Sequence, residues 1–162
     1  MKRLILLSLI LCASLTFATE TYKYPAEGQA IMSIDFPQAW LVEKDEEMLH
    51  ATSPDELVYL NLWALQEVTQ VDDAIDIIDE VLAVYLQELE LNDAETGSVN
   101  DLEMVFIDGS GEDMEGNPVT TSVVLFSPDN ETVMLTFFVA TPTGAQNNKN
   151  DIKEIITSIK KL

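Results

Sequence analysis

Cysteine, histidine and basic residues are scarce in this 162-residue chain. Cys12, His50 and Arg3 each occur once, and 29 acidic residues face 8 basic ones. One thiol cannot form a disulfide within the chain or build a cysteine-based metal site. The net charge of −21 also disfavours nucleic acid and anionic membranes as partners. No pattern in the sequence predicts catalytic residues or a cofactor site. In particular, Gly109-Ser110-Gly111 is not the serine nucleophile motif that His50 would need as a partner.

The first 18 residues have the pattern of a secretory signal peptide. Lys2 and Arg3 precede an apolar stretch, and Thr16-Phe17-Ala18 forms a small-x-small cleavage signal. The stretch has about 14 residues, whereas a membrane-spanning helix needs about 20. We therefore expect a periplasmic or secreted protein, cleaved near Ala18, with one domain over residues 19–162 and no transmembrane segment in the mature chain.

The composition after residue 18 predicts a folded domain and not a disordered polyanion. Residues 19–162 contain 6 lysines against 29 acids, a net charge of −23. Leucine, isoleucine, valine and phenylalanine make up 42 of these 144 residues. That share lies well above the roughly 20% below which a highly charged chain stays unfolded.

Hydrophobic periodicity predicts an α+β fold. Period-two alternation predicts strands over 30–36, 41–43, 49–52 and 58–65, the last of them central in its sheet and covered on both faces. An amphipathic helix of about five turns follows, from a capping box at Thr69 and Asp72 to Leu89. Three further strands, 102–107, 119–126 and 132–140, lead to a closing helix that ends at Leu162. Short turns between successive strands predict an antiparallel sheet with flanking helices.

The element order and two motifs resemble the PsbP/Mog-type fold family, whose bacterial relatives include exported DcrB-like proteins. The motifs are Phe36-Pro37-Gln38-Ala39-Trp40 after the first strand and Ile155-Ile156-Thr157-Ser158-Ile159 in the last helix. The resemblance covers roughly residues 22–162 and implies an antiparallel sheet sandwiched between helices, with a binding or assembly role. We therefore expect a non-enzymatic binding or accessory domain of the bacterial cell envelope. Its partner would be another envelope protein or a small ligand.

Two other functions stay open, a hydrolase that uses carboxylates and a calcium-dependent binding module. The candidate cation ligands lie in one Gly-rich acidic segment, which the sequence places at a hairpin tip: Asp108, Glu112, Asp113 and Glu115. The segment does not follow the EF-hand pattern, because Asp113 stands where the sharp-turn glycine is needed.

Two further groups of residues are candidates for binding. Asp72, Asp76 and Glu80 are spaced four apart on the predicted helix and form an acidic stripe for a basic partner or, more simply, a solvated face. The aromatic residues Trp40, Tyr59 and Trp63 either line a ligand cavity or belong to the core.

The excess of acidic groups predicts a salt dependence. Raising the ionic strength from low to physiological values screens the repulsion among these groups, so the melting temperature of the domain should rise. Calorimetry in increasing sodium chloride measures this. A melting temperature that falls over that range would contradict the prediction.

Overall fold

The computed structural model describes residues 18–45 and 47–162. The expected signal peptide, apart from Ala18, lies outside the described residues. Within these residues, eleven strands and three helices follow one another. They are β1 (Thr19–Tyr24), β2 (Met32–Pro37), β3 (Leu41–Lys44), β4 (Met48–Thr52), β5 (Val58–Ala64), α1 (Val71–Leu82), β6 (Gln87–Leu91), β7 (Glu95–Val99), β8 (Leu102–Glu112), β9 (Pro118–Phe126), β10 (Met134–Ala140), α2 (Pro142–Asn147), α3 (Lys149–Ser158) and β11 (Lys160–Lys161).

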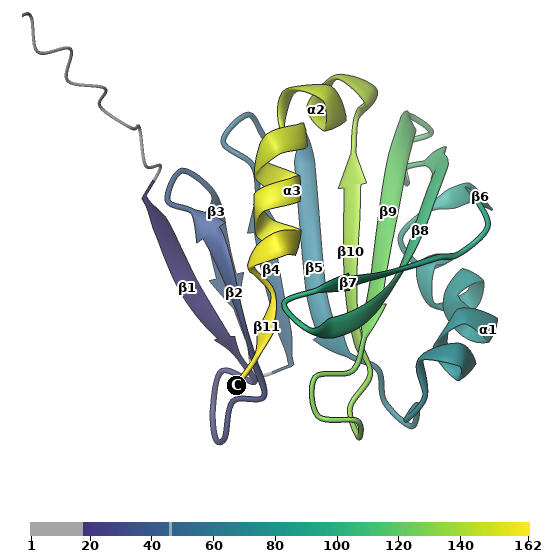
Figure 1. The fold of residues 1–162 in the computed structure, drawn as a ribbon. Coiled ribbons are helices and arrows are strands. Elements are labelled where there is room, and N and C mark those ends of the chain that lie inside the picture. Colours follow the sequence, from purple (N-terminus) through teal and green to yellow (C-terminus); the bar gives the residue numbers. More distant parts are fainter. Residues whose placement is uncertain (1–17, 46) are drawn as a thin grey trace, which may run out of the picture.

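Eight strands form one large sheet in the order β3-β4-β5-β10-β9-β8-β6, with β7 also paired to β8 (Figure 1). Every described strand pair is antiparallel. β5 and β10 lie in the middle, where Leu60 faces Phe138 and Leu62 faces Thr136. The strand expected over 58–65 is therefore central, as predicted.

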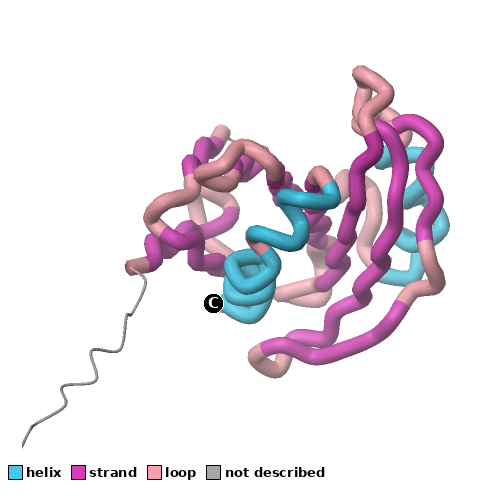
Figure 2. Tube along the Cα trace, turned by 90° about the horizontal axis from the view of Figure 1, so that it is seen from above, coloured by secondary structure: helices cyan, strands magenta, loops and turns pink. Residues whose placement is uncertain are grey.

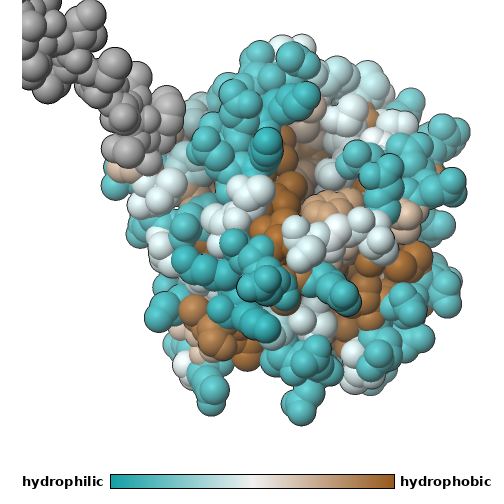
Figure 3. All heavy atoms as spheres, viewed as in Figure 1, coloured by the Kyte–Doolittle hydropathy of each residue, from teal (hydrophilic) through white to brown (hydrophobic). Residues whose placement is uncertain are grey.

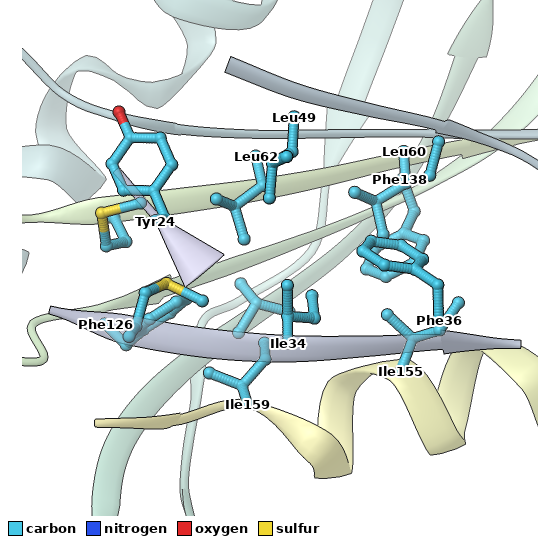
Figure 4. Packing of buried hydrophobic residues seen from close by; sticks show 14 of the residues in the cluster. Tyr24, Ile34, Phe36, Leu49, Leu60, Leu62, Phe126, Phe138, Ile155 and Ile159 are labelled. Carbon is cyan, nitrogen blue, oxygen red and sulfur yellow. The ribbon is translucent and has the colours of Figure 1, made fainter. Parts of the chain in front are cut away.

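A smaller sheet, β1-β2-β11, packs together with α3 over one face of the large sheet (Figures 1 and 2). The first hydrophobic core fills the space between these layers. Ile34 and Phe36 of β2 and Ile155 of α3 point toward Leu60 and Phe138 of the large sheet (Figure 4). All five side chains are at most 2% exposed, so this layer is a closed core.

Helix α1 covers part of the opposite face and forms a second core. Its buried residues Ala74, Ile78 and Leu82 pack in one cluster with side chains of β8, β9 and β10. The sheet is thus flanked on both faces, which confirms the predicted antiparallel sheet with flanking helices. Among the described helices, none has the length and hydropathy needed to cross a membrane.

The predicted long helix is wrong at both ends. α1 has 12 residues, and its N-cap Gln70 makes no side-chain capping bond, so the expected capping box at Thr69 and Asp72 is absent. The chain leaves the helix after Leu82, and residues 87–91 form β6. Leucines 86, 89 and 91 reach the same core from this extended segment. Pairing with β8 therefore overrides their helical spacing.

The Gly-rich segment is strand and not hairpin tip, which corrects a second expectation. β8 runs through Gly109 and Gly111 to Glu112, and the turn comes only at residues 113–117. A Cβ atom at Gly109 would lie 2.6 Å from the carbonyl oxygen of Glu90, and one at Gly111 would lie 2.9 Å from that of Gln87. The two glycines thus let the backbone of β6 approach β8 closely.

Both ends of the domain differ from the prediction as well. Residues 19–24, for which no strand is predicted, form β1 on β2. The closing helix is divided into α2 and α3 and ends at Ser158, and Lys160 and Lys161 instead pair with β2 as β11. Register with β2 explains both departures, since Leu162 also donates its backbone N–H to the carbonyl of Ile31.

The contact between α2 and the loop before β5 predicts a destabilising substitution. Gly144 is buried, and a Cβ atom there would collide with the carbonyl oxygen and Cβ of Leu57. Gly144→Ala should lower the free energy of unfolding by about 1–3 kcal/mol through overpacking. Thr143→Ala on the exposed neighbour is the matched control, and urea unfolding compares the two. Equal stability of the two variants would contradict this packing.

Candidate functional site

The part of the large sheet that α1 leaves bare is an open surface over β3, β4 and β5. The core beneath α1 contains no residue of β3 or β4. Strand register places Leu41, Thr52, Tyr59 and Val139 in one row across four strands, with their side chains on the same face. Leu41 is 63% exposed and Tyr59 is 51% exposed. The expectation that the central strand β5 is covered on both faces is therefore wrong at Tyr59.

A second row lies beside the first, and the two rows together are called the open face. In this row Glu43 pairs with His50, His50 with Asn61, and Asn61 with Phe137. A groove of 280 Å³ follows the open face to the end of α1. Residues of five elements or turns line it, among them Tyr59, Asn61, Tyr85, Asp113, Phe137 and Val139.

His50 is fixed on the open face by its neighbours. Its Nδ1 lies 2.6 Å from Oδ1 of Asn61, so Nδ1–H is the donor when Asn61 presents its oxygen. Its Nε2 lies 3.7 Å from Oδ2 of Asp45. Backbone N–H groups of Glu47 and then Met48 hold the pKa of Asp45 below its usual value, with a smaller contribution from His50. The histidine is therefore held by an amide and a carboxylate, and no hydroxyl nucleophile is bonded to it.

Asp113 forms the edge of the groove at the turn between β8 and β9. Its Oδ1 accepts from the backbone N–H groups of Glu115 and Asn117, both at 2.9 Å, and the Asn117 side chain donates to Oδ2 at 2.9 Å. The Asn117 side chain, followed by the Asn117 backbone N–H, holds the pKa of Asp113 below its ordinary value. These hydrogen bonds close the turn and favour the ionised form of Asp113 at the edge of the groove.

The structure does not bring the four candidate cation ligands together. Asp108 lies within β8 and accepts a hydrogen bond from the Ser122 hydroxyl at 2.6 Å. Asp113 comes five residues later, about 15 Å along the strand direction. Glu112 ends β8 and Glu115 lies in the turn. Within residues 18–45 and 47–162, no group of three or more acidic, histidine or cysteine side chains is placed to hold a metal ion.

Asp72, Asp76 and Glu80 do share one exposed side of α1, as their spacing predicts. No basic residue lies in the last turn of the helix. The structure therefore leaves this stripe in solvent.

The three aromatic residues separate. Trp40 is buried in the first core, where its indole N–H donates to Asp151 at 3.0 Å. Trp63 is half-buried against the second core, with its ring centroid 6.1 Å from that of Tyr85. Tyr59 alone lies on the open face. Trp40 therefore belongs to the core, and Tyr59 belongs to the groove.

Sequence reasoning missed Tyr85, Phe137 and the pair of His50 with Asn61 as groove residues. Tyr85 follows the apolar stripe of α1 and is read as core, and Phe137 lies in a continuous apolar run. In the sequence, His50 and Asn61 are visible only as polar residues within the largely apolar strands β4 and β5. Only the strand register shows that the two residues are neighbours.

No protein-family model matches the sequence, and no curated protein matches it. Solved structures do share its fold. A protein from Bacteroides thetaiotaomicron is 15% identical with a TM-score of 0.59, over 88% of this chain and 48% of that one. This chain thus spans about half the length of that protein.

Two further structures match over most of both chains. The cyanobacterial PsbP (CyanoP) from Synechocystis is 11% identical with a TM-score of 0.59, over 95% of this chain and 99% of that one. LpqN from Mycobacterium tuberculosis, described as involved in cell envelope biogenesis, is 10% identical with a TM-score of 0.56, over 88% and 91%. The fold is therefore PsbP-like.

The hydrogen bonds at Asp113 predict the effect of removing Asn117. In Asn117→Ala the carboxylate loses its side-chain donor, so the pKa of Asp113 should rise toward its ordinary value. A lowered pKa stabilises the fold above the unfolded pKa, and this stabilisation is lost as the pH falls through the folded value. The variant should therefore be less stable than the wild type at pH 7, and the difference should vanish in acid.

Carboxyl-detected NMR titration measures the pKa, and urea unfolding at several pH values measures the stability. Asn150→Ala, which alters an exposed amide on α3, is the control and should leave the Asp113 titration unchanged. A titration curve of Asp113 that is the same in both variants would refute the assigned bonds.

Proposed function

We propose that this protein is an exported, non-catalytic binding domain of the cell envelope that holds a protein partner on its open face. The half-exposed Tyr59, in the middle of the sheet, carries the proposal. Tyrosine is enriched at the centres of protein interfaces, where its ring supplies apolar area and its hydroxyl bonds a partner. Leu41 extends the same row to the edge strand β3, so the patch is contiguous across the strands.

Export is supported by the basic and apolar pattern of residues 1–18. The PsbP-like fold supports it as well, because LpqN, which shares that fold, is described as involved in cell envelope biogenesis. A surface dominated by acidic groups keeps such a domain soluble and apart from anionic lipid.

A binding role is favoured over the carboxylate hydrolase by the direction of the acid shifts. A general acid needs a raised pKa, as burial in an apolar pocket provides. Hydrogen bonds instead lower the pKa of Asp45, Asp55 and Asp113, for Asp55 first through the Ser53 hydroxyl. The calcium-dependent module is favoured by no observation, since Asp108 and Asp113 each have partners within the protein.

The acidic residues at the edge of the open face indicate the chemistry of the partner. Glu43, Asp45 and Asp113 border the apolar row, and no lysine lines the groove. Complementary charge favours a partner that presents an apolar or aromatic side chain flanked by basic residues. Such a partner also gains from long-range attraction to the acidic body.

The proposal predicts that charge placed on the open face abolishes partner binding and leaves the fold intact. Tyr59→Glu should reduce recovery of a specific envelope partner about tenfold or more, since a central anchor contributes more than about 1.4 kcal/mol. Leu41→Glu, on the edge strand, should reduce recovery by a smaller factor. Leu162→Glu is the matched control, because Leu162 is 60% exposed and lies beyond β11. Affinity capture from envelope extract, quantified by mass spectrometry, compares the three, with melting temperatures to verify folding.

Two outcomes would contradict the proposal. One is equal recovery of partners by all three variants. The other is turnover of a glycoside or ester substrate by the purified protein, lost on substitution of an acidic residue.

A further inference from the structure

A second recess lies on the opposite side of the large sheet, between α3 and strands β8 and β9. It has a volume of 410 Å³, within the range of small-molecule sites. Phe138 and Ala140 of β10 form its floor, and Ala145 and Ile152 of α2 and α3 form one wall. Figure 3 shows apolar side chains gathered in a hollow beside the hydrophilic surface of α2 and α3.

The recess exists because the cover on this face is too narrow for the sheet. The small sheet and α3 pack over β4, β5, β10 and the lower ends of β8 and β9, so only the upper part of β8 and β9 stays bare. At the lower end β7 returns across the strands (Figure 1). There the Asn100 side chain donates to the carbonyls of Thr157 and Ile159, both at 2.8 Å, and ties the turn after β7 to the end of α3. The recess is therefore open at the top and closed below.

The two ends of the recess differ in polarity. Register places Phe106, Val124 and Thr136 in the row below Phe138, and Phe106 and Ile156 are half-buried against the first core. The upper rim carries hydroxyl groups from Thr120 and Ser122 of β9. A ligand that fits must be apolar along most of its length and polar at one end.

Lys149 sets the charge of that polar end. It is the one basic residue among those lining the recess, although residues 19–147 carry a net charge of −25. It is exposed, and the described residues form a single ion pair, between His50 and Asp45, which leaves the Lys149 ammonium available. Asp108 also faces the recess, and its carboxylate accepts from the Ser122 hydroxyl. A ligand group with a single negative charge is therefore favoured next to Lys149. A group with two negative charges is disfavoured, because the carboxylate of Asp108 repels it.

We propose that this recess binds a medium-chain monocarboxylate, with its alkyl chain along Ala145 and Ile152 and its carboxylate at Lys149. The site lies on the face opposite to the open face and goes beyond the partner binding proposed above. Binding replaces water on the half-buried apolar wall formed by Ala145 and Ile152 and pairs one ammonium with one carboxylate. Each further methylene that enters the recess raises the affinity about fourfold.

The test uses sodium decanoate as the probe, with sodium octanoate and 1-octanol as comparisons. The isotope-labelled protein, in the form that cells accumulate, is titrated by NMR below the micelle concentrations of the two carboxylates and below the solubility limit of 1-octanol. Decanoate should shift the amide signals of Thr120, Ser122 and Ile152 and bind about fifteenfold tighter than octanoate, because two more methylenes are buried.

Two variants with a matched control locate the carboxylate. Lys149→Gln should weaken octanoate about twofold to fivefold, the effect of one exposed ion pair, and leave 1-octanol unchanged. Lys160→Gln removes the same charge from β11, outside the recess, and should change neither. Thr120→Trp fills the exposed rim and should weaken all three probes.

Three results would overturn the inference. They are the absence of shifts at millimolar decanoate, shifts centred on Tyr59 and Asn61 of the open face, and equal effects of Lys149→Gln and Lys160→Gln. A negative result here leaves the partner experiment with Tyr59→Glu unaffected, since the probe and the surface both differ.

Discussion

The register of β10 between β5 and β9 is the constraint on which the rest of the structure depends. In β10, even-numbered residues such as Phe138 belong to the core beneath α3, and odd-numbered ones such as Phe137 belong to the core beneath α1. A slip of one residue would exchange the two sets and place each against the wrong layer. The apolar side chains on both faces of this strand therefore commit the whole sheet to covers on both sides.

These covers are displaced from one another across the sheet. On one face the small sheet and α3 lie over β4, β5, β10 and the lower ends of β8 and β9, and on the other α1 lies over β8, β9 and β10. β8, β9 and β10 therefore contribute side chains to both cores. One face stays bare over β3 to β5, and the other stays bare over the upper part of β8 and β9. The open face and the recess beside α3 both follow from this single displacement.

Local sequence was sufficient to predict the strands and the helix whose apolar residues recur with a regular period. The alternation of residues 30–36 and 58–65 and the stripe of Ala74, Ile78 and Leu82 predicted β2, β5 and α1, and together they predicted an antiparallel sheet with flanking helices. Where pairing with a distant strand determines the secondary structure, the hydrophobic period predicted the wrong element. The leucines at 86 and 89 continue a helical spacing yet leave the helix, because β8 offers two glycines against which an extended chain can lie.

The candidate site was less predictable than the fold. Tyr59 was identified as a residue of interest from its place on the second face of an apolar strand. Its neighbours His50 and Tyr85 come from positions 9 residues before it and 26 residues after it, and register and helix placement bring them together. For the acidic segment at 108–115, proximity in sequence was misleading. Its residues are close in sequence, but an extended strand separates Asp108 from Asp113.

The placement of α1 and α3 on opposite faces also separates electric charge across the sheet (Figure 2). The outer side of α1 carries five acids and no lysine, whereas four of the six lysines after residue 18 lie on α3 and β11. The helices on the two faces therefore contribute a difference in charge across the large sheet, with α1 the more negative side. In the field of a charged surface this difference in charge produces a torque that turns the α1 side toward positive charge and the α3 side toward negative charge before any contact forms.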